Sequence, residues 1–139
     1  MRERTELRPM VTSENTILDT TLATMERPGG ERAELRFKLG QRITLSGILE
    51  IFAQLERNKW ATPREWLVVF PDEPIVIEFV AMLTDHVVGR PANSISYRLA
   101  VAVGDPSNMP RFQQYFATFP SEITVGIFLT EEEARAWLG

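Results

Sequence analysis

The 139-residue sequence has no cysteine, a single histidine and no apolar run near the ~20 residues of a membrane-spanning helix. Without cysteine, disulfides, thiolate metal sites and a cysteine nucleophile are excluded. With one histidine, a metal site would need carboxylate ligands, and no carboxylate cluster has the spacing of a metal-binding loop. The sequence therefore predicts no metal, no other cofactor and no membrane span.

The chain also lacks a large charge of either sign, since 15 Lys and Arg stand against 19 Asp and Glu, a net charge of -4. Basic residues are scattered among acidic ones, so nucleic acid is not an expected partner. The absence of cysteine fits a reducing compartment. Residues 1–14, where Arg and Glu alternate, lack the apolar core of a signal peptide. We expect a cytoplasmic protein with a flexible leader over residues 1–14.

The composition that remains is that of a globular domain, with 44% apolar and 24% charged residues. A chain of this length forms one domain, which we place over residues 15–139. The clearest pattern lies in its last third, where the apolar runs 97–104 and 123–129 flank a helix that Ser107 would cap. This order predicts a βαβ unit with two parallel strands at the centre of a sheet.

Two strands are predicted near the start of the chain. Residues 16–24 are rich in β-branched side chains, and the run 34–39 alternates between polar and apolar residues. A Pro-Gly-Gly turn between them predicts a hairpin. The alternation places Leu35, Phe37 and Leu39 on a buried face and Glu34 on a solvent face.

The middle of the chain adds a helix that Thr44 would cap and a strand over residues 66–70, covered on both faces. Residues 75–88 fit a helix by spacing, although their first residues favour a strand by propensity. Thr130 and Glu133 have the spacing of a capping box for a closing helix. The prediction is a single-domain α/β fold, with a mixed sheet of about five strands and about four packed helices.

The end of the chain carries a resemblance to a known family. It consists of Arg98-Leu99-Ala100-Val101-Ala102-Val103, a helix containing Met109-Pro110-Arg111-Phe112, the strand Val125 to Phe128, and Glu133-Ala134-Arg135-Ala136-Trp137-Leu138. With the element order, this ending resembles the bacterial SpoIIAA-like, STAS-related domains. The resemblance covers residues 16–139 in element order and only the final third in sequence. It implies a SpoIIAA-like fold and a non-catalytic regulatory or protein-interaction module.

The resemblance also implies a docking surface for another protein. STAS regulators of sigma factors carry a phosphorylated serine after an Asp, at the start of the helix that follows the central strand. The equivalent stretch here is Phe70-Pro71-Asp72-Glu73-Pro74, which has no hydroxyl. Asp72 and Glu73 would then form a permanently acidic docking surface, or would only stabilise the start of a helix. Trp60 and Tyr115, expected to be exposed, are further interface candidates.

Other residues support different hypotheses. Ser107, Asn108 and Arg111 lie where a strand leads into a helix, a position at which α/β sheets bind anions or small ligands. A plain turn is the alternative at this position. The aromatic set Phe112, Phe116, Phe119 and Trp137 would line the pocket of a carrier for a lipid-like ligand, or would simply pack in the core.

Enzymatic activity is not expected. His86 has Asp85 as its neighbour, but adjacent helical residues do not face each other, so Asp85 would not orient His86 as a general base. No activated nucleophile or cofactor fingerprint is present. A homodimer through the edge strand 16–24 is left open, because short polar edges also prevent such pairing.

Overall fold

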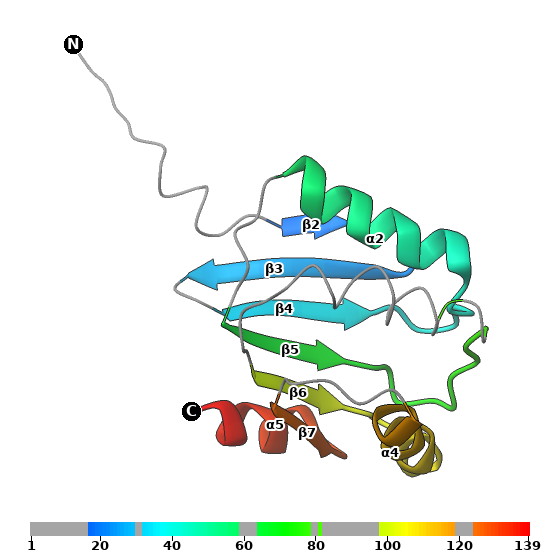
Figure 1. The fold of residues 1–139 in the computed structure, drawn as a ribbon, viewed down its shortest axis with the longest axis vertical. Helices are drawn as coiled ribbons and strands as arrows, with labels where there is room; N and C mark the ends of the chain where they lie inside the picture. Colours follow the sequence, from blue (N-terminus) through cyan, green and yellow to red (C-terminus); the bar gives the residue numbers. More distant parts are fainter. Residues whose placement is uncertain (1–16, 30–31, 59–63, 79–80, 82–97, 119–123) are drawn as a thin grey trace.

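In the computed structural model, six strands form one mixed sheet, and their order across the sheet is also their order along the chain (Figure 1). The structure describes residues 17–29, 32–58, 64–78, 81, 98–118 and 124–139. Its strands are β2 (Ile17–Asp19), β3 (Ala23–Gly29), β4 (Arg32–Phe37), β5 (Glu65–Val69), β6 (Arg98–Ala102) and β7 (Thr124–Phe128). Its helices are α2 (Leu45–Arg57), the short 3-10 helix η2 (Pro106–Asn108), α4 (Met109–Thr118) and α5 (Glu131–Leu138). The expected α/β class is confirmed.

The sheet divides into an antiparallel part and a parallel part. β2, β3 and β4 pair antiparallel, so the expected hairpin forms between β3 and β4. The strands from β4 to β7 all pair parallel. The two apolar runs of the last third are confirmed as parallel neighbours, with Val101 of β6 beside Ile127 of β7.

The expectation of one strand over residues 16–24 is wrong, because the chain turns at Thr20. The Thr20 hydroxyl donates to the carbonyl of Ala23 (2.9 Å) and accepts from its amide (3.1 Å). Such local side chain-to-backbone bonds favour a turn over an extended strand. They separate β2 from β3, and the described residues consequently contribute six strands to the sheet, where about five were expected.

Two of the three expected helix caps are confirmed. The Thr44 hydroxyl accepts from the amide of Gly47 (3.1 Å), and Thr130 and Glu133 form the capping box of α5. Ser107, however, is not the cap before α4. The chain first makes η2, whose N-cap is Asp105, and α4 begins at Met109. None of the helices in the described part of the chain is long and apolar enough to cross a membrane.

The helix expected over residues 75–88 does not begin at Ile75. Residues 75–78 are extended, and Ile77 forms an isolated parallel bridge with Ile43. The amide of Ile43 donates to the carbonyl of Val76 (2.9 Å), which fixes this β-branched stretch beside the start of α2. Ala81 is helical, and the rest of the segment lies outside the described residues. Three α-helices are present in the described ranges, where about four were expected for the whole chain.

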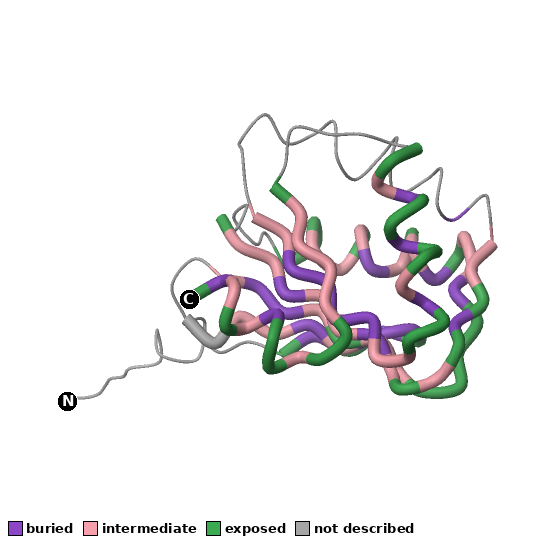
Figure 2. The backbone as a smooth tube through the Cα atoms, turned by 90° about the horizontal axis from the view of Figure 1, so that it is seen from below, coloured by how far each residue is buried: buried purple, intermediate pink, exposed green. Residues whose placement is uncertain are grey.

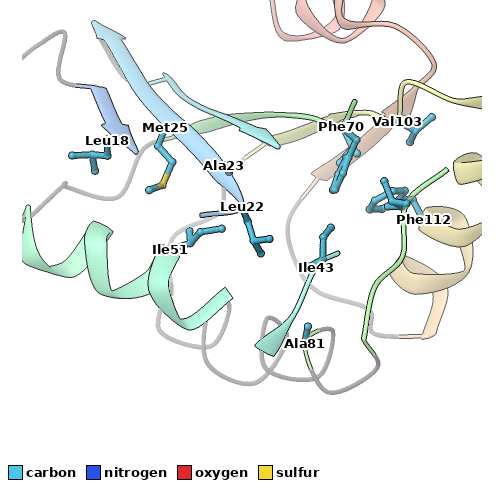
Figure 3. Close-up of a cluster of buried hydrophobic side chains, with 12 residues drawn as sticks. Leu18, Leu22, Ala23, Met25, Ile43, Ile51, Phe70, Ala81, Val103 and Phe112 are labelled. Atoms are coloured by element: carbon cyan, nitrogen blue, oxygen red, sulfur yellow. The ribbon is translucent and has the colours of Figure 1, made fainter. Parts of the chain in front are cut away.

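The larger core cluster lies on the face of the sheet that α2 and α4 cover (Figure 3). Phe70, at the end of β5, packs against Phe112 of α4 and Phe37 of β4, with ring centroids 4.6 Å apart in both pairs. The buried members of this cluster are Leu18, Leu22, Ala23, Met25, Ile43, Ile51, Phe70, Ile75, Ala81, Val101, Val103 and Phe112. The buried residues of the described chain come from the strands, from the helices that cover them and from the loops between them, whereas exposed residues lie toward the outside (Figure 2).

The second face of the sheet is covered by α5. Ala134 and Leu138 of this helix pack on Leu67, Ala100 and Ala102, so small side chains on β6 let the helix approach closely. The expectation that Glu34 faces solvent is therefore wrong, since its residue is only 8% exposed beneath α5. Leu39, expected on the buried face, is 67% exposed because β4 ends at Phe37.

Candidate functional site

The loops that follow β5, β6 and β7 meet at one end of the sheet, which is the end toward which these arrows point in Figure 1. Val69, Ala102 and Phe128 are aligned in register across the three strands. The pairing continues one residue further, because the amide of Phe70 donates to Ala102 O (2.9 Å) and that of Val103 to Phe128 O (2.8 Å). This carboxyl end of the sheet is where α/β folds commonly place their binding sites.

Gly104 fixes two of these loops against each other. Its φ of 78° lies in the left-handed region that favours glycine. A Cβ at this position would collide with the carbonyl oxygen of Pro71 and would lie 2.7 Å from that of Phe70. Only glycine lets the loop after β6 approach the loop after β5 this closely.

The side chain of Asn108 joins the same two loops through hydrogen bonds. Its residue is completely buried, and its Oδ1 accepts from the amide of Ile75 (3.0 Å). Its Nδ2 donates to the carbonyls of Glu73 and Val103, each at 3.0 Å. All the hydrogen-bonding capacity of the side-chain nitrogen is thus used inside the chain, as expected of a fully buried amide.

The other two residues of the predicted anion site also have internal partners. The Ser107 hydroxyl donates to Asp105 Oδ1 (2.7 Å), and Arg111 Nη1 donates to the carbonyl of Ile75 (2.8 Å). The structure therefore brings Ser107, Asn108 and Arg111 together around one turn, in which each of them holds the backbone or a neighbouring carboxylate. A bound anion at this position stays a prediction.

Asp72 and Glu73 lie in this end of the sheet, but not at the start of a helix as expected. They occupy bends between β5 and the extended residues 75–78. Glu73 Oε2 accepts from the amide of Gly40 (2.6 Å), so this carboxylate connects the loop to the one that follows β4. Asp72 is exposed, and its carboxylate has no partner among the described residues.

Asp105 contributes a second carboxylate. Its pKa is lowered by the hydrogen bond from the Ser107 hydroxyl and, next, by the bond from the Ser107 amide (2.8 Å). The group is consequently ionised at neutral pH. The sequence pattern predicts Ser107 as the cap. Asp is an equally favoured cap residue, however, and Pro106 at the first helical position is a signal for Asp105.

The start of α5 adds more negative charge at the same end. Glu131 pairs with Arg36 of β4 (2.7 and 3.0 Å) and with Arg135 one turn along α5. The hydrogen bond from Arg36 is the largest cause that lowers the pKa of Glu131 to about 2. Glu133 closes the capping box, and Glu132 is exposed.

A charged cluster that the sequence did not indicate lies between α5 and β4. Arg135 donates two hydrogen bonds to Glu34, both at 2.9 Å, while also pairing with Glu131. The pKa of Arg135 is raised above its usual range, and the hydrogen bonds to Glu34 are the largest cause of this shift. Arg36, whose pKa is raised chiefly by its hydrogen bonds to Glu131, completes the cluster. Each buried or half-buried charge is thus matched by one of opposite sign.

The amino end of the sheet carries positive charge. Arg32 and Arg98 lie in register on either side of Glu65, and both donate to it. Arg98 also donates to the carbonyl of Leu138 (3.1 Å), and its guanidinium lies 4.5 Å from the ring centroid of Trp137. These contacts fix the last turn of α5, whose carbonyl end favours cations.

The remaining candidates lie elsewhere. Tyr115 was expected to be exposed but is buried, because it follows Phe112 by three positions and shares its helix face. Phe112 packs on the face covered by α4, whereas Trp137 contacts Phe128 on the face covered by α5 (centroids 5.6 Å). These two members of the aromatic set therefore do not line one pocket. Trp60, His86 and Phe119 lie outside the described residues.

In the described part of the chain, no group of three or more His, Asp or Glu side chains is arranged to hold a metal ion. Comparison with known proteins gives no match to a family model, to a curated protein or to a solved structure.

Proposed function

We propose that the protein is a non-catalytic interaction module, related in architecture to the SpoIIAA-like domains, that binds a partner protein through the carboxyl end of its sheet. We define the acidic end as Asp72, Asp105 and Glu132, one residue from each of the loops or helix starts that follow β5, β6 and β7. The partner would present a basic segment. The resemblance implied docking at Asp72 and Glu73, and the acidic end extends that surface.

The observation that supports this proposal most strongly is that the exposed carboxylate of Asp72 lies on a loop whose backbone is held in place by contacts on both sides. Asp72 is exposed and has no partner among the residues that the structure describes. Its loop is held in place on one side by the close approach of Gly104 to Pro71 and on the other by Asn108. A charge presented on a fixed backbone loses little conformational entropy when a partner binds.

The position of Asp72 and Glu73 argues against the simpler explanation, in which these residues only stabilise the start of a helix. Acidic side chains at a helix start stabilise the helix through its dipole. Residues 71–78 contain no helix, so Asp72 and Glu73 do not act in that way. Glu73 has a structural role through Gly40, which leaves Asp72 as the residue whose charge needs another explanation.

A charge reversal at the acidic end tests the proposal. Partners captured from cell extract by the wild-type protein, by Asp72→Lys/Glu132→Lys and by Glu56→Lys are compared by quantitative mass spectrometry. Glu56 is exposed on α2, away from the carboxyl end, and serves as the matched control. We expect a specific partner that is retained by Glu56→Lys and by the wild-type protein, and lost by the acidic-end variant. Equal capture by all three proteins would refute the docking surface.

The alternative of a carrier for a lipid-like ligand gains no support from the aromatic residues. Its pocket would need Phe112 and Trp137 on one side of the sheet, and they lie on opposite sides.

A further inference from the structure

The two edges of the sheet differ in how they are protected against pairing. β2 at one edge has three residues, and its Asp19 forms an ion pair with Lys38 (2.9 Å). β7 at the other edge has five residues, Thr124-Val125-Gly126-Ile127-Phe128, with no charged residue and no proline. Within the described ranges, no strand pairs with the outer side of β7. Short strands, charges and prolines are the usual protection of an edge, and β7 has none of them.

The backbone groups that β7 presents outward can be identified. Phe128 turns its carbonyl toward β6, where it accepts from the amide of Val103 (2.8 Å). Successive residues of a strand direct their backbone groups to alternate sides. Thr124 and Gly126 therefore also face β6, while Val125 and Ile127 direct their N–H and C=O groups to the open edge.

We propose that the chain forms a two-fold dimer through antiparallel pairing of β7 with β7 of a second copy. Val125 would form hydrogen-bonded pairs with Ile127 of the second copy, and Ile127 with its Val125. Gly126 would then face Gly126 of the second copy at the close, non-hydrogen-bonded position, where Cα atoms lie about 4.5 Å apart. Gly126 has no side chain to oppose this approach; within its own chain, a Cβ at this position would lie 2.7 Å from the ring of Phe128.

The charges at the two ends of the sheet favour the antiparallel arrangement. The carboxyl end near β7 is acidic, with Asp105, Glu132 and Glu133, while Glu131 is paired with Arg36 and Arg135. At the amino end, Arg32 and Arg98 both pair with Glu65, and Arg64 directly precedes Glu65 in the chain. Antiparallel pairing brings the acidic end of each copy beside the basic end of the other, whereas a parallel arrangement would join ends of like charge. Because the two ends of one chain are complementary in charge, a second copy of the chain is the occupant that suits this edge best.

This inference shares Asp105 and Glu132 with the acidic end, but it depends on the backbone of β7 and not on Asp72, so the variants below test it separately from the proposed function. Val125→Pro removes an outward N–H without breaking the ladder between β6 and β7, and proline is tolerated at such edge positions. Val125→Ala is the matched control, since it loses the side chain and keeps the N–H. We expect the wild-type protein and Val125→Ala to sediment at twice the 15.9 kDa chain mass, and Val125→Pro to sediment as a monomer. A wild-type monomer at all concentrations, or a dimer that Val125→Pro leaves intact, would overturn the proposal.

If Val125→Pro does not fold, cross-linking of an introduced cysteine tests the proposed dimer. The chain has no cysteine, so a single introduced cysteine reports its own surroundings. In the proposed pairing, Val125 lies diagonal to Val125 of the second copy, about 7–8 Å away. A short bis-maleimide should therefore join two copies of Val125→Cys. The control Ile17→Cys lies on β2, where the residue is 63% exposed, and should stay monomeric. Cross-linking through Ile17→Cys in place of Val125→Cys would assign the dimer to the opposite edge and contradict the proposal.

Discussion

Glu34 and Arg135 are 101 positions apart in the sequence and form a two-pronged ion pair, with both N–O distances 2.9 Å. The pair fastens α5 to β4 across the face of the sheet that Leu67 and Ala100 line. Because Glu34 is buried and Arg135 covers it, the interaction is worth more than a pair on an open surface, where the usual value is about 0–1 kcal/mol.

Removing the cation from this pair should destabilise the fold. Arg135→Ala leaves Glu34 buried without its main partner, which we expect to cost about 2–3 kcal/mol of the free energy of unfolding. The measurement is urea unfolding at neutral pH. Glu132→Ala on the exposed side of α5 is the control and should change stability by no more than about 0.5 kcal/mol. Equal stability of the two variants would show that the pair has no structural role.

Acid should weaken the attachment of α5 through Glu131. The hydrogen bond from Arg36 lowers the pKa of Glu131 from its ordinary value of 4.5 to about 2, so the folded state prefers the charged form. Its stabilisation is fully present above pH 4.5 and is lost as the pH falls toward 2. Because the group is partly exposed, we expect a loss of no more than about 1 kcal/mol. Urea unfolding between these pH values should show a smaller decline for Glu131→Gln than for the wild-type protein; parallel declines would contradict this role.

Gly40 and Gly104 have similar backbone angles but different surroundings. Substituting each of them therefore distinguishes the cost of a left-handed backbone from the cost of a steric clash. Gly40 and Gly104 have φ values of 76° and 78°, but only Gly104 has atoms close to its missing Cβ. Gly40→Ala should cost about 1–2 kcal/mol for the left-handed backbone alone. Gly104→Ala should cost clearly more, because its Cβ meets the carbonyls of Phe70 and Pro71. Thermal melting of both variants provides the comparison, and equal losses would mean that the two loops are not in contact.

Asn108 should behave as a structural residue. Asn108→Ala leaves the amide of Ile75 and the carbonyls of Glu73 and Val103 without their side-chain partner. Each buried group left unpaired costs about 1–3 kcal/mol, so we expect this variant to be among the least stable. Asn58→Ala, at the exposed end of α2, is the control. A stable Asn108→Ala variant that loses affinity for phosphate would instead support the anion site.

Local patterns in the sequence predicted much of this architecture. The apolar runs before Gly104 and Leu129 predicted the parallel pair, and Thr44 and Thr130 predicted helix starts. These signals are available because caps and buried strands depend on residues near one another in the chain. Thr20 was missed, since its turn depends on a hydroxyl that also suits a strand.

The candidate site was harder to predict, because it depends on contacts between distant residues. Alternation in β4 indicated a solvent face for Glu34, but α5 covers that face with a matching arginine. Asn108 and Glu73 each look like loop residues in sequence, but Asn108 bonds to Ile75 and Glu73, and Glu73 bonds to Gly40, all of them 33 or more positions away. The burial of Tyr115, in contrast, follows from a local relation, since Tyr115 comes three positions after Phe112 and shares its buried helix face.

The central claim is that Asp72 presents a charge to a partner from a rigid loop. The most direct measurement is the affinity of the captured partner for the wild-type protein and for Asp72→Lys, each at low and high salt. We expect the reversal to weaken binding at least tenfold and to remove most of the salt dependence, because an attractive charge pair is lost. An affinity and a salt dependence that are the same for both proteins would contradict the account.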